Sequence, residues 1–169
     1  EIAEMIHEYG GWCFVDFAAC APYININMHP ANPAQKLDAI FFSPHKFLGG
    51  PGASGVVIFD KSLYDSHFAP DQPGGGTVKW TNPWGEHSFY EDVELREDGG
   101  TPAFLQTIKT ALCIKLKEHM NPELMLKREE ALKDYIFERF NSIGNLHVLA
   151  GNIKERLLIL SFYIDDLHY

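Results

Sequence analysis

Several features that would define a protein class are scarce or missing in this chain of 169 residues. Cysteine occurs only at Cys13, Cys20 and Cys113, with no CxxC pair, so neither a disulfide framework nor a zinc site is expected. No apolar run approaches the roughly 20 residues of a membrane helix, and no signal peptide is recognisable. These absences predict a cytoplasmic protein with reduced thiols and no membrane partner.

Basic residues are also few relative to acidic ones. Lys and Arg together number 14 against 23 Asp and Glu, which gives a formal net charge of -9. Such a balance gives no electrostatic help to binding nucleic acid or an anionic membrane. With 46% apolar residues the chain can build a core, so a small molecule or another protein is the expected partner.

The two ends of the sequence fall within regular patterns. Glu1 opens directly onto a helical pattern, without a methionine, and Tyr169 follows a strand-like run. We therefore expect the chain to be a piece of a larger protein.

Apolar runs alternate with helical and loop segments in the first 60 residues. Helical spacing over 2–9 stops at a Gly-Gly pair, and apolar runs at 12–15, 37–42 and 55–59 predict three strands. Near-continuous apolar runs are typical of parallel strands covered on both faces. Asp16 follows the first run, where open α/β sheets place ligand-binding residues. The pattern predicts an α/β fold.

A long segment over 69–101 is expected to be mostly irregular, because it is rich in Pro and Gly. Loops of this length in compact domains usually serve function or an interface, and its aromatic content argues against disorder. Docking against a second chain and packing over its own domain are both consistent with the pattern. The aromatic residues are Trp80, Trp84, Phe89 and Tyr90.

The remaining chain reads as helices followed by strands. An apolar stripe over 104–116 predicts an amphipathic helix, and Asn121-Pro122 is typical of the start of a second, longer helix. Runs at 146–149 and 156–164 around a Gly-Asn turn predict two strands. This tail has its own helix-strand-strand character and suggests the start of another domain.

The stretch around Lys46 concentrates reactive groups. Ser43, His45 and Lys46 follow the second strand, and a glycine-rich turn comes directly after them. A lysine acts as a nucleophile when its pocket favours the neutral amine. The hydroxyl, the imidazole and the glycine backbone suit a phosphate, although no GxxxxGK[ST] or GxGxxG pattern is present.

Each of these residues also has an ordinary structural interpretation. Lys46 could be a surface lysine, and Asp16 could be a helix N-cap or turn residue. His45 could be a core residue. No second His or Cys stands at ligand spacing from it, so no metal site is expected.

Four segments together resemble the signature of class V pyridoxal-phosphate (PLP) aminotransferases, a group that includes cysteine desulfurases and selenocysteine lyases. They are 15–18 (VDFA), 38–55 (DAIFFSPHKFLGGPGASG), 74–76 (GGG) and 97–102 (EDGGTP), in the family's order. The match covers roughly residues 1 to 120. Its specificity lies in the agreement of separate motifs.

The resemblance implies a role for each candidate residue. Lys46 would form the internal aldimine with PLP and then move the substrate's α-proton, while Asp16 would pair with the pyridinium nitrogen. Ser43 and His45 would hold the cofactor phosphate. Thr101 would contact the phosphate bound by the partner protomer, since the family's active sites lie at a homodimer interface.

The resemblance also implies the architecture. The chain would be part of a fold-type I PLP-dependent enzyme with a mainly parallel sheet. Residues 1–120 would be the C-terminal part of the large PLP-binding domain, with 69–101 as its interface loop. Residues 121–169 would begin a small α+β C-terminal domain.

The sequence departs from the family pattern in three respects. Ala19 stands where desulfurases usually carry a Gln that reaches the phenolic oxygen of the cofactor, and the Thr101 motif has an extra glycine. The family's N-terminal phosphate loop, its ring-stacking residue and the arginine that binds the substrate carboxylate are expected outside these residues. None of the three cysteines stands where a desulfurase carries its catalytic cysteine.

The leading hypothesis is a PLP-dependent enzyme acting on an amino acid, of aminotransferase or lyase type. One alternative is a desulfurase or selenocysteine lyase whose catalytic cysteine lies downstream. Another is an inactive fold-type I protein that serves as a scaffold; Asp16 and Lys46 argue against it, while Ala19 leaves it open. A glycine-rich nucleotide-binding domain does not fit, because the glycines follow Lys46 instead of opening a helix.

Overall fold

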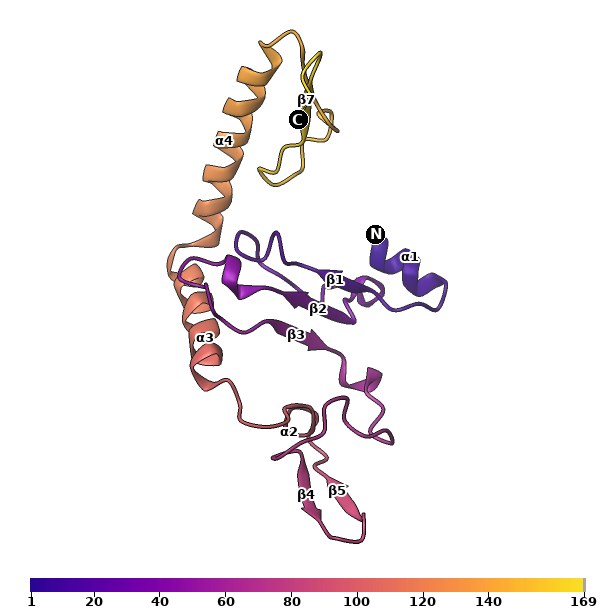
Figure 1. Ribbon diagram of the computed structural model, residues 1–169. Helices are drawn as coiled ribbons and strands as arrows, with labels where there is room; N and C mark the ends of the chain where they lie inside the picture. The colour runs from indigo at the N-terminus through magenta and orange to yellow at the C-terminus, as the bar shows by residue number, and fades with distance from the viewer. Residues whose placement is uncertain (169) are drawn as a thin grey trace.

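The computed structural model describes residues 1–168 and has a mixed α/β architecture (Figure 1). A small sheet forms its centre, with strand order β1-β2-β3. β1 and β2 are parallel, whereas the edge strand β3 runs antiparallel to β2, as edge strands of largely parallel sheets often do. The elements of this part are α1 (Ile2–Glu8), β1 (Phe14–Asp16), the 3₁₀ turn η1 (Pro33–Gln35), β2 (Ala39–Phe42), η2 (Pro44–Lys46), β3 (Val56–Phe59) and η3 (Lys61–Leu63).

The sheet is covered on only one face by the described residues. Ile40 of β2 is 3% exposed, whereas its neighbour Phe41, on the other face, is 42% exposed. The described residues do not cover the second face, so the expectation of strands covered on both faces stays a prediction for the larger protein. Phe14 and Val57, which share the face of Phe41 through the strand register, are exposed as well. Apolar side chains on both faces of each strand explain the continuous apolar runs in the sequence.

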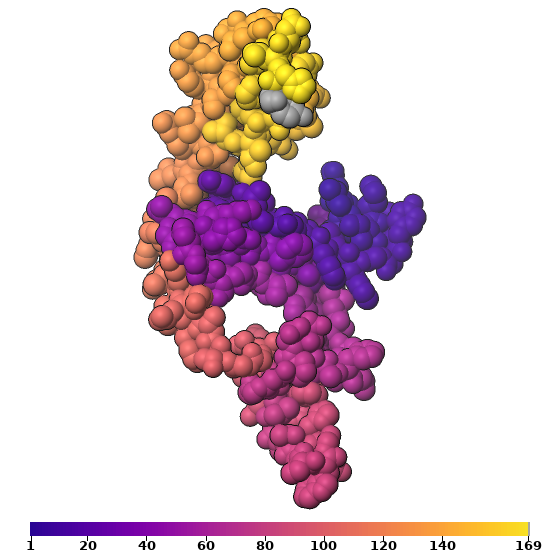
Figure 2. All heavy atoms as spheres, in the orientation of Figure 1, coloured from indigo at the N-terminus to yellow at the C-terminus, as the bar shows by residue number. Residues whose placement is uncertain are grey.

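A hairpin stands where the sequence predicts mostly irregular structure. Strands β4 (Val78–Thr81) and β5 (His87–Phe89) pair antiparallel with an irregular register, and a short helix, α2 (Val93–Glu97), follows. The Asn82 side chain organises the turn by accepting hydrogen bonds from the backbone of Trp84 and Glu86. The hairpin projects from the body of the molecule (Figures 1 and 2).

The C-terminal part begins with two long helices. They are α3 (Phe104–His119) and α4 (Pro122–Asn141). Asn121 caps α4 by accepting from the backbone N–H groups of Glu123 and Leu124, which confirms the predicted helix start. α4 leads away from the sheet to a second hairpin (Figure 1). That hairpin consists of β6 (Leu146–Val148) and β7 (Phe162–Ile164), so the last strand begins later than predicted.

The division into a domain over 1–120 and the start of another over 121–169 stays a prediction. Within residues 1–168, no helix is long and apolar enough to cross a membrane.

The covered face of the sheet packs against α3 through a small core. Phe47, Cys113 and Ala21 are buried together, with Phe42 and Ile114 packed against them. These contacts bring together the loop after β1, the loop after β2 and helix α3. The core therefore lies directly beneath the two loops that carry the candidate site residues.

Candidate functional site

Asp16 and the 43–46 loop lie at the same edge of the sheet. The parallel register pairs Asp16 with Phe41, and Phe17 continues the pairing by donating its N–H to the Phe41 carbonyl at 2.9 Å. Neighbouring strands lie about 4.8 Å apart, so the residues that leave β1 and β2 emerge side by side. The candidate carboxylate and the candidate lysine loop are thus brought together by strand pairing.

The Asp16 side chain is exposed and has one oxygen engaged. Its Oδ1 accepts a hydrogen bond from the Ala18 N–H at 2.7 Å, which fixes the turn after β1. Oδ2 has no partner among the described residues. Asp16 thus stabilises a turn, as its simpler structural interpretation predicts. Its second carboxylate oxygen is still available to a donor outside the chain.

Lys46 ends η2 and presents its amine to open space. The Lys46 N–H donates to the Ser43 carbonyl at 3.0 Å, and Pro44 starts the turn. The side-chain amine of Lys46 makes no hydrogen bond or ion pair among residues 1–168. The next residue, Phe47, is buried and stacks on Phe42 with ring centroids 5.9 Å apart. One face of the loop is anchored in the core, and Lys46 is left exposed.

The loop closes on itself at Gly50. A Cβ at Gly50 would lie 1.9 Å from the Pro44 carbonyl oxygen, closer than any side chain can approach. Gly49, just before it, has a φ of 75°, in the left-handed region that glycine adopts without strain. The glycines after Lys46 therefore serve first to fold the lysine loop tightly.

Lys117 of α3 contacts both the loop after β1 and the loop after β2. Its Nζ donates to the carbonyl of Ala21 at 2.6 Å and to that of Ile24, in the segment after Asp16, and lies 5.8 Å from the centroid of the Phe47 ring. Burial lowers the pKa of the Lys117 amine and raises the pKa of the nearby Cys20 thiol. Sequence reasoning assigned Lys117 no role, because the sequence shows only a lysine beside an apolar helix stripe.

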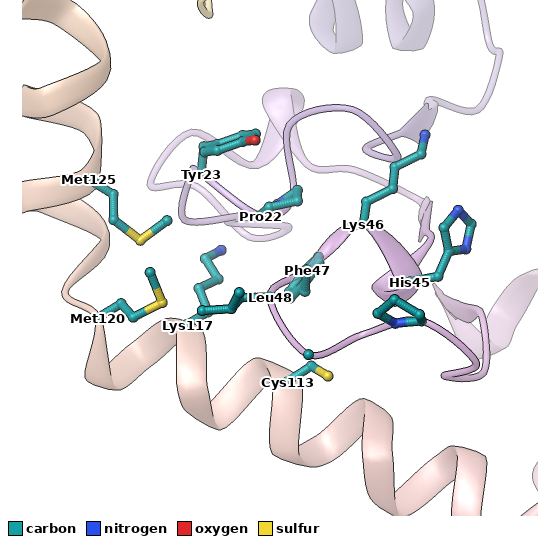
Figure 3. Close-up of a pocket in the computed structure, with 12 residues that line it drawn as sticks. Pro22, Tyr23, His45, Lys46, Phe47, Leu48, Cys113, Lys117, Met120 and Met125 are labelled. Atoms are coloured by element: carbon teal, nitrogen blue, oxygen red, sulfur yellow. The ribbon is translucent and has the colours of Figure 1, made fainter.

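A cavity of about 480 Å³ lies beneath the lysine loop. Tyr23, Met120 and Met125 gather on one side of it, while the side chains of His45 and Lys46 extend away from that group (Figure 3). The cavity is therefore bounded by the underside of the loop. His45 and Lys46 belong to the lining of this cavity, at the end away from Tyr23, Met120 and Met125.

Four of the five candidate residues lie at one sheet edge in the structure: Asp16, Ser43, His45 and Lys46. The fifth, Thr101, lies elsewhere. The Ser43 hydroxyl and the His45 ring have no hydrogen-bond partner among the described residues, so both remain available to a ligand. Thr101 precedes α3, whose residue Cys113 packs against the lysine loop. At 1.5 Å per residue, about 14 Å of helix separates Phe104 from Cys113, so Thr101 lies outside this cluster. The roles assigned to all five residues stay predictions.

Among the described residues, no group of three or more His, Cys, Asp or Glu side chains is placed to hold a metal ion. The groups at this sheet edge are an amine, a carboxylate, a hydroxyl and an imidazole. That set suits an aldehyde-bearing, phosphorylated, nitrogen-containing ring: the amine for the aldehyde, the carboxylate for a protonated ring nitrogen, and the other two for phosphate.

Comparison with known proteins gives a consistent result. A family model described as "Aminotransferase class-V" matches residues 1–169. A probable cysteine desulfurase from Halobacterium salinarum is 26% identical over 170 residues, covering 99% of this chain and 39% of that protein. The chain thus spans about two fifths of the length of the curated relatives it matches.

Solved structures of low sequence identity share the fold. The apo structure of a cysteine desulfurase from Thermococcus onnurineus NA1 aligns with a TM-score of 0.79 at 24% identity, over 99% of this chain and 40% of that one. A C-DES mutant whose PLP cofactor carries a covalently linked glycine aligns with a TM-score of 0.67 at 17% identity, over 87% of this chain and 37% of that one. These matches establish the fold of the PLP-dependent cysteine desulfurases, which is fold-type I.

Proposed function

Because the chain belongs to the class V aminotransferase family, we propose that the protein containing it is a PLP-dependent enzyme acting on an amino acid, of aminotransferase or lyase type. One observation carries the proposal: the parallel pairing of β1 and β2 sets Asp16 beside the loop of Ser43, His45 and Lys46. The donor set at that edge fits PLP group by group. When bound, PLP acts as an electron sink for the substrate's α-carbon.

The chain's own residues divide the work of binding and proton transfer. Lys46, whose amine is exposed, would attach the cofactor covalently and later move the α-proton. Asp16 Oδ2 would accept a hydrogen bond from the protonated ring nitrogen, while Oδ1 accepts from the Ala18 N–H, which fixes the carboxylate's orientation. Ser43 and His45 would donate hydrogen bonds to the phosphate. Charge-assisted hydrogen bonds of this kind are the strong ones.

Cysteine desulfuration is the second candidate reaction. The names of the relatives favour it, since the first curated match is a probable cysteine desulfurase. Among the described residues Cys13 and Cys113 are buried, and Cys20 is partly buried with a raised pKa, so none offers an exposed thiolate nucleophile. A desulfurase would need its sulfur-accepting cysteine elsewhere in the protein.

The proposed assembly is a homodimer with shared active sites. Thr101 lies apart from the Lys46 loop of its own chain, which agrees with a contact to the partner's cofactor phosphate.

We place the enzyme in the cytoplasm, consistent with its three unpaired cysteines. An inactive scaffold remains the alternative from another functional class, and Ala19 at the position of the usual Gln is the feature that favours it.

Borohydride trapping on the full-length protein tests the proposal. The protein is incubated with PLP, its visible spectrum is recorded, and it is then reduced with borohydride and peptide-mapped. We expect a yellow protein whose cofactor label maps to Lys46. Lys46→Ala should be colourless and unlabelled, whereas the control Lys115→Ala, at an exposed lysine of α3, should match the wild type. A colourless wild-type protein with no label on Lys46 would favour the scaffold.

A further inference from the structure

A second cavity of about 390 Å³ lies between the segment before β4, strand β5 and helix α2. It shares no lining residue with the cavity beneath the Lys46 loop. Phe68, Phe89 and Tyr90 give it an aromatic wall, and His67 and His87 lie on its lining. A cavity of this size is in the range that holds a small ligand.

One lining residue is a buried arginine with few partners. Arg96 of α2 is only 5% exposed, and its guanidinium lies between the rings of Tyr64 and Phe89, at 5.4 and 5.6 Å from their centroids. Its Nη2 donates to the Phe68 carbonyl at 2.6 Å. Nε is enclosed without any hydrogen-bond partner.

The third nitrogen of this guanidinium is the one left for a ligand. Nη1 makes no hydrogen bond among residues 1–168, and it is not among the enclosed atoms without a partner. It therefore keeps contact with open space, and the cavity is the space that the Arg96 side chain lines. Nη1 is thus the nitrogen of Arg96 that is both unpartnered and not enclosed.

No carboxylate in the described part of the chain forms an ion pair with Arg96. Glu97, its neighbour, is engaged by the Tyr64 hydroxyl and by the Asp71 N–H at 3.1 Å. Glu91, on the cavity lining, pairs with Lys79 at 2.8 Å. The two aromatic rings offset part of the cost of burying the guanidinium, but a buried charge normally has a counter-ion.

We propose that this cavity binds a small organic carboxylate. The carboxylate accepts a charge-assisted hydrogen bond from Nη1 of the Arg96 guanidinium. The apolar body of the ligand rests against Phe68 and Phe89. The Nε2 atoms of His67 and His87 make no hydrogen bond among the described residues and supply further polar contacts at the lining.

Calorimetric titration of the full-length protein with benzoate tests the site. We expect saturable benzoate binding, with acetate and inorganic phosphate each at least about 10-fold weaker. Arg96→Met should show no saturable binding, while Arg128→Met, at an exposed arginine of α4, should bind as the wild type does. Because the titration does not use the PLP cofactor, its result is independent of the proposed activity.

Several results would overturn the proposal. One is the absence of saturable benzoate binding to the wild type, as expected if a carboxylate side chain from another part of the protein fills the cavity. Another is phosphate binding more tightly than benzoate. If Arg96→Met does not fold, Arg96→Lys keeps the charge but lacks the planar guanidinium that positions Nη1, and should weaken binding about 10-fold. Unchanged affinity in that variant would refute the role of Arg96.

Discussion

His7 lies between two groups that can only accept hydrogen bonds. Its Nδ1 is 2.7 Å from the Ala34 carbonyl oxygen, and its Nε2 is 2.8 Å from Oδ2 of the buried Asp38. When both ring nitrogens carry protons, His7 donates to both of these acceptors, so the fold favours the imidazolium form. The hydrogen bond to Asp38, followed by that to Ala34, raises the pKa of His7.

Asp38 receives further donors that keep it ionised. Burial by itself would raise the pKa of this carboxyl, but hydrogen bonds from His7, the Cys13 N–H and Lys36 outweigh it and lower the pKa to about 2. Lys36 also reaches Asp60 at 3.4 Å. The cluster ties α1 to the start of β2.

These shifts predict how stability depends on pH. The raised pKa of His7 means that its contribution is complete below about pH 6.5, the unfolded value, and is lost as pH rises through the folded pKa. The lowered pKa of Asp38 means that its contribution is present above pH 3.8 and is lost as pH falls toward about 2.

Urea unfolding of the full-length protein at a series of pH values measures how much His7 contributes to the free energy of unfolding. We expect the wild type to lose stability above about pH 6.5, and His7→Gln to lack that alkaline loss. The control His29→Gln changes an exposed histidine whose ring makes no hydrogen bond or ion pair with the described residues, and it should keep the wild-type profile. Identical alkaline slopes in the wild type and His7→Gln would contradict the assignment.

Among the elements, the loop from Pro44 to Gly50 depends most on a single small residue. Gly50→Ala would place a Cβ 1.9 Å from the Pro44 carbonyl oxygen, so the backbone of η2 would have to move. Overpacking of this kind typically costs about 1–3 kcal/mol. We expect a lower urea midpoint and weaker retention of PLP on dialysis of the full-length protein.

Gly55→Ala is the matched control for that change. A Cβ at Gly55 would meet nothing within 4 Å, and Gly55 does not have a positive φ. Its urea midpoint and PLP retention should stay at wild-type values or rise slightly. If both alanine variants behave alike, steric closure at Gly50 does not hold the lysine loop.

Elements with a strong periodic signal were predictable from the sequence, and elements made by side-chain contacts were not. The strand ahead of Lys46, a helix over 104–116 and the Asn121 cap follow from local patterns, and the structure contains them. The predicted apolar stripe of that helix is nevertheless exposed at Phe104, Ile108 and Leu112. The β4–β5 hairpin was missed because its strands are short and its turn rests on the Asn82 side chain. Lys117 and Arg96 were missed because their roles come from residues distant in the sequence.

At the scale of the whole molecule, the apolar surface is larger than an isolated chain would keep. The β4–β5 hairpin projects outward with Trp80 51% and Trp84 83% exposed. Both interpretations of this segment, docking against a second chain and packing over the rest of its own domain, stay predictions. Exposed tryptophans on a projecting hairpin are typical of an interface, which fits the proposed homodimer.

Sedimentation velocity of the full-length protein tests this arrangement. We expect the wild type to sediment as a dimer and the double variant Trp80→Asp/Trp84→Asp as a monomer, because two charges would be buried without partners in the interface. Tyr135→Asp adds a charge on exposed α4, away from the hairpin, and should leave the dimer intact. A dimeric double variant would show that the hairpin is not the interface. A monomeric wild type would contradict a shared active site, because Thr101 would then have no partner protomer whose cofactor phosphate it could contact.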